Sequence, residues 1–121
     1  MNKIRLAKLA DFLETVPEDK FNMDVWAYLG NKTSLGDCGT AGCALGWATK
    51  IFPELTINFS FSNPYPDLYF EGFRNYSALE LFFDLDFELS RDLFSALRYP
   101  DPANISPQEV ANKIRQAVEA Q

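Results

Sequence analysis

The sequence predicts an α+β domain that is mostly helical, with about five to six short helices and a small central two-stranded β element. Three features of the 121 residues indicate this class. Apolar residues recur at helical spacing in several segments. Residues 56–61 alternate between polar and apolar side chains, which is typical of a strand. Prolines and glycines divide the chain into segments, so the elements between them are expected to be short.

The N-terminal segment, residues 3–15, has its apolar residues on one side of a helix and most of its charged residues on the other. A short second helix is expected between residues 21 and 29. Asn22 or Asp24 would serve as its N-cap, because short polar side chains accept hydrogen bonds from the first turn. Gly30 is expected to end it.

The middle of the chain predicts one helix followed by the β element. Thr40 is a plausible N-cap for a third helix over residues 41–52, which the next proline ends. Residues 56–61 form the predicted strand, and residues 63–67 are rich in turn residues. Residues 68–73 would return as the second strand of the element.

A fourth helix is predicted over residues 78–84, because Ser77 and Glu80 form a capping box before an apolar run. Residues 83–89 also alternate as a strand would. We favour a break in the helix, with Asp86 capping a fifth helix, over that strand.

The last helix has the best-defined start in the sequence. Ser106 is a suitable N-cap, Pro107 fits the first helical position, and Glu109 completes a capping box. Val110, Ile114 and the apolar residues after them then share one face.

Length and composition fit one domain that spans residues 1–121. Apolar residues make up 47% of the chain and include eleven phenylalanines, so one core can be filled without metals or several disulfides as staples. No signal peptide or membrane-spanning run is recognisable, and a cytoplasmic location with reduced thiols is expected.

The charge and the missing histidines make several functions unfavourable. The net charge is −6, whereas nucleic acids and anionic membranes attract basic surfaces, so neither is expected as a partner. The chain has no histidine, which removes Ser–His and Cys–His pairs, the usual zinc ligand sets and the commonest general base. We therefore assign no catalytic residue, no metal ligand and no cofactor.

Residues 37–48 are unusual because they contain both cysteines, Cys38 and Cys43, and half of the glycines. We interpret this segment as a packing motif. Gly42 and Gly46 would share one face of the predicted third helix, where small residues let another backbone approach closely. Two glycines inside a helix cost roughly 1 kcal/mol each relative to alanine, and close packing would offset that cost. Trp47 is expected to need a partner for its indole N–H.

Chemical roles of the two cysteines are the alternatives. Cys43 would lie in the first turn of the predicted helix, which lowers a thiol pKa, but no histidine is present to act as its base. Asp37 would raise the pKa of a neighbouring thiol. Two thiolates fall short of the four ligands of a structural zinc site, and five residues of separation differ from a Cys-x-x-Cys motif. A disulfide or redox switch between Cys38 and Cys43 stays open.

The same segment carries a resemblance. Cys38, Gly39, Thr40, Cys43, Gly46, Trp47 and Ala48 resemble a Cys-Gly-Thr-x-x-Cys-x-x-Gly-(Trp/His)-Ala motif of small uncharacterised proteins of bacteria and their phages. Leu93-Phe94 and the helix start at Ser106 would match later features of that group. The resemblance implies a similar organisation and an origin in a mobile element, but it implies no activity.

Residues 59–76 are rich in aromatic side chains, which together with arginine are enriched in protein interfaces. We predict a partner-binding surface there, made by Tyr65, Tyr69, Phe70, Phe73 and Arg74. Packing of the same rings into the core is an equal alternative. The acidic stretch 80–88 would form a rim. Asp84-x-Asp86-x-Glu88 begins like a calcium loop, but the glycine and glutamate that such a loop needs later are missing.

The sequence thus favours a small acidic, non-enzymatic protein that binds another protein. A phage or mobile-element accessory factor that acts on a host protein fits its size, its acidity and the resemblance. A thiol redox or metal-dependent module centred on Cys38 and Cys43 is the alternative.

Overall fold

The computed structural model describes residues 1–23, 27–28, 41–60 and 63–120. At residues 27–28, 41–42, 57–60 and 63–67 it describes the backbone alone. The elements follow one another as α1 (Lys3–Leu13), the 3₁₀ turn η1 (Glu18–Lys20), β1 (Ala27–Tyr28), β2 (Ala41–Gly42), α2 (Ala44–Ala48), β3 (Thr56–Ser60), β4 (Asn63–Phe70), β5 (Phe73–Arg74), α3 (Tyr76–Phe83), α4 (Phe87–Phe94), the 3₁₀ turn η2 (Ala96–Arg98) and α5 (Pro107–Glu119). The predicted class, a mostly helical α+β fold, is confirmed.

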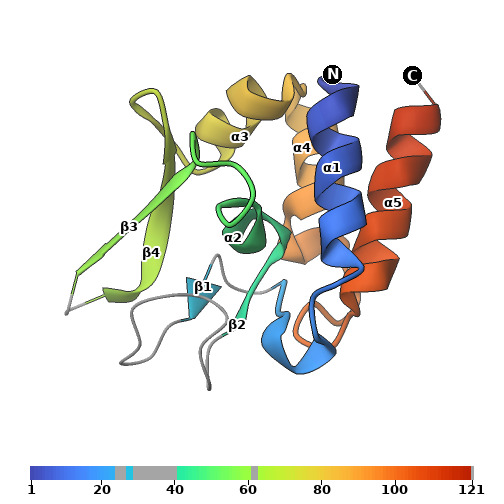
Figure 1. Cartoon of the computed structure of the whole chain (residues 1–121), viewed down its shortest axis with the longest axis horizontal. Helices are drawn as coiled ribbons and strands as arrows, with labels where there is room; N and C mark the ends of the chain where they lie inside the picture. The colour runs from blue at the N-terminus through green and yellow to red at the C-terminus, as the bar shows by residue number, and fades with distance from the viewer. Residues whose placement is uncertain (24–26, 29–40, 61–62, 121) are drawn as a thin grey trace.

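Helices and sheet occupy opposite sides of the structure (Figure 1). Helix α1 packs along α5, with α4 beside them and α3 leading towards the sheet. The central sheet has the antiparallel order β3-β4-β5, so a short third strand joins the predicted pair. A separate pair is formed by β1 and β2. Both termini of the drawn chain lie on the same side of the molecule, at the top of Figure 1.

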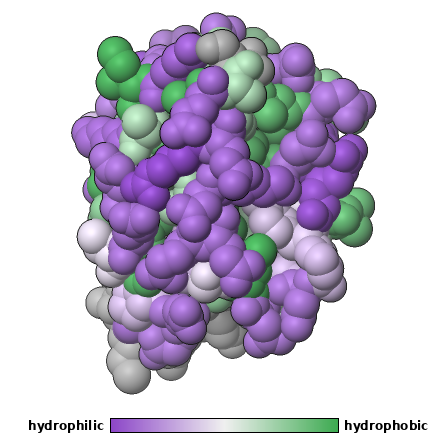
Figure 2. Space-filling model, turned by 90° about the vertical axis from the view of Figure 1, so that its right-hand side faces the viewer, coloured by the Kyte–Doolittle hydropathy of each residue, from purple (hydrophilic) through white to green (hydrophobic). Residues whose placement is uncertain are grey.

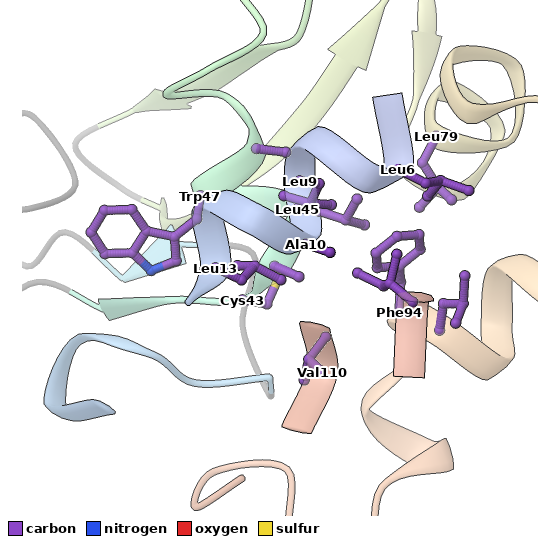
Figure 3. Packing of buried hydrophobic residues seen from close by; sticks show 14 of the residues in the cluster. Leu6, Leu9, Ala10, Leu13, Cys43, Leu45, Trp47, Leu79, Phe94 and Val110 are labelled. Carbon is purple, nitrogen blue, oxygen red and sulfur yellow. The ribbon is translucent and has the colours of Figure 1, made fainter. Parts of the chain in front are cut away.

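The core is made mainly by side chains of the five α-helices, which meet one another (Figure 3). Leu6, Leu9 and Leu13 line one face of α1 and are fully buried. Phenylalanine rings extend this core towards the sheet. The Phe82 ring lies 5.0 Å, centroid to centroid, from each of the rings of Phe52, Phe70 and Phe83, always edge to face. Aromatic pairs in this geometry add to the free energy gained by burial.

Helices α4 and α5 begin at the N-caps that the sequence predicts. The Asp86 carboxylate accepts a hydrogen bond from the Leu89 N–H at 2.8 Å, and the Ser106 hydroxyl accepts one from the Glu109 N–H at 3.1 Å. The break before α4 is therefore confirmed. The capping box predicted for α3 is wrong, because the N-cap of α3 is Asn75.

The second predicted helix is also wrong. Ala27–Tyr28 is a strand that pairs with Ala41–Gly42. Ahead of it, Phe21 and Met23 are buried, while Asn22 between them is half-buried. This alternation has the period of an extended chain and not of a helix.

The third predicted helix is shorter than expected. Because Ala41 and Gly42 pair in β2, α2 begins only at Ala44, with Cys43 as its N-cap residue, and ends at Ala48. Gly42 and Gly46 therefore do not share a helix face, which corrects that part of the packing interpretation. The predicted cap Thr40 lies outside the described residues.

The predicted turn over residues 63–67 is part of strand β4. Two prolines fit in this strand because β5 pairs only with its last two residues, Tyr69 and Phe70, among the described residues. Proline cannot donate to a ladder and is tolerated where one side of a strand lacks a neighbour. The return towards β5 is made at Glu71 and Gly72, whose φ angles are 49° and 84°.

Candidate functional site

The predicted partner-binding residues gather at the β4–β5 turn. Tyr69 pairs with Arg74, and Phe70 pairs with Phe73. Phe70 packs inward on Phe82, whereas Phe73 is 51% exposed and Arg74 is exposed as well. The side chain of Tyr65 lies outside the described residues. The predicted exposure to a partner therefore fits Phe73 and Arg74, whereas the alternative of packing into the core fits Phe70.

A second aromatic surface lies next to this turn and was not predicted. We call Tyr76, Phe87 and Arg91 the aromatic–arginine stack. The Arg91 guanidinium carbon lies 4.2 Å from the centroid of the Tyr76 ring and 3.9 Å from that of the Phe87 ring. Phe87 remains 60% exposed. The signal in the sequence was the spacing of Phe87 and Arg91, because residues four apart meet on one helix face.

Polar contacts hold the guanidinium of the stack in place. Arg91 donates to a Glu80 carboxylate oxygen at 2.6 Å, and the same oxygen accepts a bond from the Ser90 hydroxyl at 3.0 Å. Both Arg91 and Glu80 are mostly buried, so this ion pair is less screened than a surface pair. The exposed Phe87 ring is therefore backed by a fixed planar cation.

Several carboxylates lie between Tyr76 and Arg91 along the chain. Asp84 is exposed and pairs with the N-terminal ammonium at 2.8 Å. Asp86 caps α4, and Glu88 is exposed, with the Arg98 guanidinium 3.6 Å away. Residues 77–90 contain no lysine or arginine. The predicted acidic rim over residues 80–88 is thus exposed in part, while its first member, Glu80, is engaged with Arg91.

The surface around α5 is mostly hydrophilic, as the view from that side shows (Figure 2). Outside the stack and the β4–β5 turn, large exposed apolar residues among those described are Ile4, Leu81 and Leu97. These three side chains are aliphatic, so they have no ring on which a guanidinium could stack as Arg91 does on Phe87.

The structure places Cys43 in the core. Its side chain lies among residues of α1, α2 and α5 (Figure 3) and is 2% exposed. Burial raises the pKa of the Cys43 thiol to about 11, although backbone hydrogen bonds at the start of α2, led by that of Gly46, act in the opposite direction. At pH 7 about one thiol in ten thousand would be ionised. Cys43 therefore behaves as a small apolar residue rather than a nucleophile.

The remaining residues of the cysteine–glycine motif are placed in part. Gly46 is buried in α2. The Trp47 indole N–H donates to the carbonyl oxygen of Lys20 at 3.0 Å, which is the partner that its burial requires. Cys43 carries a thiol in this structure, and Cys38 and Gly39, the other residues of the alternative disulfide or redox switch, lie outside the described residues.

Within the described part of the chain, no three or more Cys, Asp or Glu side chains are grouped so that they could hold a metal ion. None of the described helices has the length and apolar character needed to cross a bilayer. No protein-family model matches the chain, and neither a curated protein nor a solved structure is significantly similar to it.

Proposed function

We propose that this chain is a non-enzymatic protein that binds another protein through the aromatic–arginine stack and the adjoining β4–β5 turn. The observation that carries the proposal is Phe87, a large ring left mostly in water and stacked on the guanidinium of Arg91. As the sequence also suggests, the protein would be an accessory factor of a phage or mobile element that acts on a host protein.

The contact of Phe87 with Arg91 favours binding. A side chain that already has a packing partner loses less conformational entropy when another protein covers it. Full burial of a phenylalanine contributes about 1.5–3 kcal/mol, and Phe87 has gained only part of this in the free protein. Aromatic and arginine side chains also carry much of the binding energy in known interfaces.

The β4–β5 turn would supply the second part of the interface. Phe73 exposes its ring three residues before Tyr76, and α3 begins directly after β5. The backbone between them is strongly constrained. Asn75 has a positive φ of 56°, accepts a bond from the Leu68 N–H through its side chain and donates its own N–H to the Leu68 carbonyl.

The alternative, a thiol redox or metal-dependent module at Cys38 and Cys43, has less support. Cys43 is buried and its pKa is raised, both of which oppose thiolate chemistry. In a Cys38→Ser variant, a thiol reagent should label Cys43 only as fast as the protein unfolds. Rapid labelling of the native protein would favour the redox module.

Capture of a partner tests the proposal. The chain and three single variants, Phe87→Ser, Phe73→Ser and Leu97→Ser, would be immobilised and exposed to bacterial lysate. Leu97 is the matched control, because it is 93% exposed and lies outside the stack in η2. We expect one partner to be retained in stoichiometric amount by the wild type and Leu97→Ser, and lost by Phe87→Ser.

Folding must be separated from binding in this experiment. Far-ultraviolet circular dichroism and thermal melting should show Phe87→Ser folded, because most of its ring lies outside the core. Retention of the same partner by folded Phe87→Ser, or absence of any specific partner, would contradict the proposal.

A further inference from the structure

We infer that the aromatic–arginine stack receives a basic amphipathic segment of the partner, in which an apolar side chain meets Phe87 and lysine or arginine side chains meet the acidic rim. This inference rests on the proposed function and names the chemistry of the partner. It follows from the charges around the exposed Phe87 ring.

Carboxylates outnumber bases along the chain around Phe87. Residues 77–92 contain five carboxylates and one guanidinium, that of Arg91. Arg91 lies between two rings and is paired with Glu80, so it offers little charge to a ligand. The Arg98 guanidinium is engaged as well, at 2.5 Å from the Asp92 carboxylate and 3.6 Å from that of Glu88, and the exposed Arg74 lies in the adjoining β4–β5 turn.

The rim carboxylates have acceptor capacity left. A carboxylate accepts about four hydrogen bonds, and Asp86 accepts one from the Leu89 N–H. Glu88 is exposed, and among the described residues it pairs with the Arg98 guanidinium at 3.6 Å. Lysine or arginine side chains of a partner would therefore find acceptors beside an apolar surface.

A basic side chain also suits the ring itself. Lysine and arginine carry apolar stems that cover rings, and their charged ends are attracted to aromatic faces. Arg91 already shows this arrangement on Phe87 at 3.9 Å. A single metal ion is a poor alternative, since the rim residues are not among any group of described side chains that converges on one point.

A defined peptide tests the inference without knowledge of the natural partner. The probe is an amphipathic peptide of lysine and leucine, and the control probe has glutamate in place of lysine. Binding would be followed by amide chemical shifts of the ¹⁵N-labelled protein. We expect the lysine peptide alone to shift amides of residues 76–91, and Phe87→Ser to abolish this localised change.

Charge variants complete the experiment. Asp86→Asn with Glu88→Gln removes two rim charges, and asparagine preserves the helix cap. Glu18→Gln with Asp19→Asn removes two charges from the exposed turn η1 and is the matched control. The rim variant should bind the lysine peptide about 5- to 10-fold more weakly, and the control variant as the wild type does.

Three results would overturn the inference: no localised shifts, equal shifts with the glutamate peptide, or equal weakening by both charge variants. Its failure is distinguishable from that of the proposed function. A captured partner that depends on Phe87 but binds equally well after the rim charges are removed would refute the basic segment alone. Localised peptide binding without any captured partner would refute the proposed function alone.

Discussion

Because the Cys43 thiol is buried, we expect the free energy of unfolding to fall as the pH rises through the alkaline range. Ionisation would place a negative charge in the core, so the folded protein keeps the proton to a higher pH than the unfolded chain does. The perturbation is a rise in pH from 8 to 10.5, with a reducing agent present. The comparison is between the wild type and Cys43→Ala.

The size of the effect follows from the raised pKa. The Cys43 pKa changes from an ordinary value of 9.0 to about 11 in the folded protein. A group whose pKa is raised by folding stabilises the protein fully below its unfolded pKa, and this contribution disappears as the pH rises to the folded value. Each pKa unit corresponds to about 1.36 kcal/mol, so about 2 kcal/mol should be lost by pH 10.5.

Other groups titrate in the same range. Burial raises the pKa of Tyr99, with a further contribution from Cys43, and so adds to the loss of stability. Burial lowers the pKa of Lys113, which acts in the opposite direction. Both residues are still present in Cys43→Ala, so the difference between the two proteins largely isolates the thiol.

Urea unfolding followed by tryptophan fluorescence provides the measurement. At pH 8 the wild type should be more stable than Cys43→Ala, because alanine leaves a small cavity. This advantage should shrink by about 2 kcal/mol by pH 10.5, following the pKa arithmetic above. A difference that stays constant over this range would show that the thiol reaches water, and the structural interpretation of Cys43 would be refuted.

Substitutions at three positions test single contacts by urea unfolding. Trp47→Phe should lower the free energy of unfolding by about 1–2 kcal/mol, because it removes the bond to the Lys20 carbonyl. Asn75→Ala should cost about 1–2 kcal/mol more than Asn75→Gly, since both lose the bond to the Leu68 N–H but glycine tolerates positive φ. Asp86→Ala should cost about 1 kcal/mol and Asp86→Asn almost nothing; equal losses would contradict its role as a cap.

The elements that were predictable from sequence are those set by local interactions. Ser106 and Asp86 each bond to an N–H three residues ahead, so their caps need no knowledge of the rest of the fold. The first helix follows from its periodic leucines, and the strand at Thr56–Ser60 follows from its alternation.

The elements that could not be predicted depend on distant partners. Ala27–Tyr28 and Ala41–Gly42 are strands of two residues, too short to have a periodic pattern, and each exists because it pairs with the other. The capping box failed for a similar reason. Glu80 bonds to Ser90 and Arg91, ten and eleven residues further along the chain.

The candidate site was likewise predictable where local sequence indicates it, and not where it depends on packing between helices. The density of aromatic residues indicated the β4–β5 turn, but it did not distinguish the inward ring of Phe70 from the outward ring of Phe73. Phe87 and Arg91 were missed because Tyr76 and Glu80 reach Arg91 only once α3 packs on α4.

Phe82 and Phe87 show why binding and folding can be separated in this protein. An arginine guanidinium covers each ring, Arg5 at 4.0 Å from Phe82 and Arg91 at 3.9 Å from Phe87. The Phe82 ring also meets three other rings and is fully buried, so its removal would open the core. Among the described residues, Phe87 has the cation–π contact with Arg91 and no contact with another ring. Most of its surface faces water. The fold therefore depends on Phe82, and the area that Phe87 leaves uncovered is available to a partner.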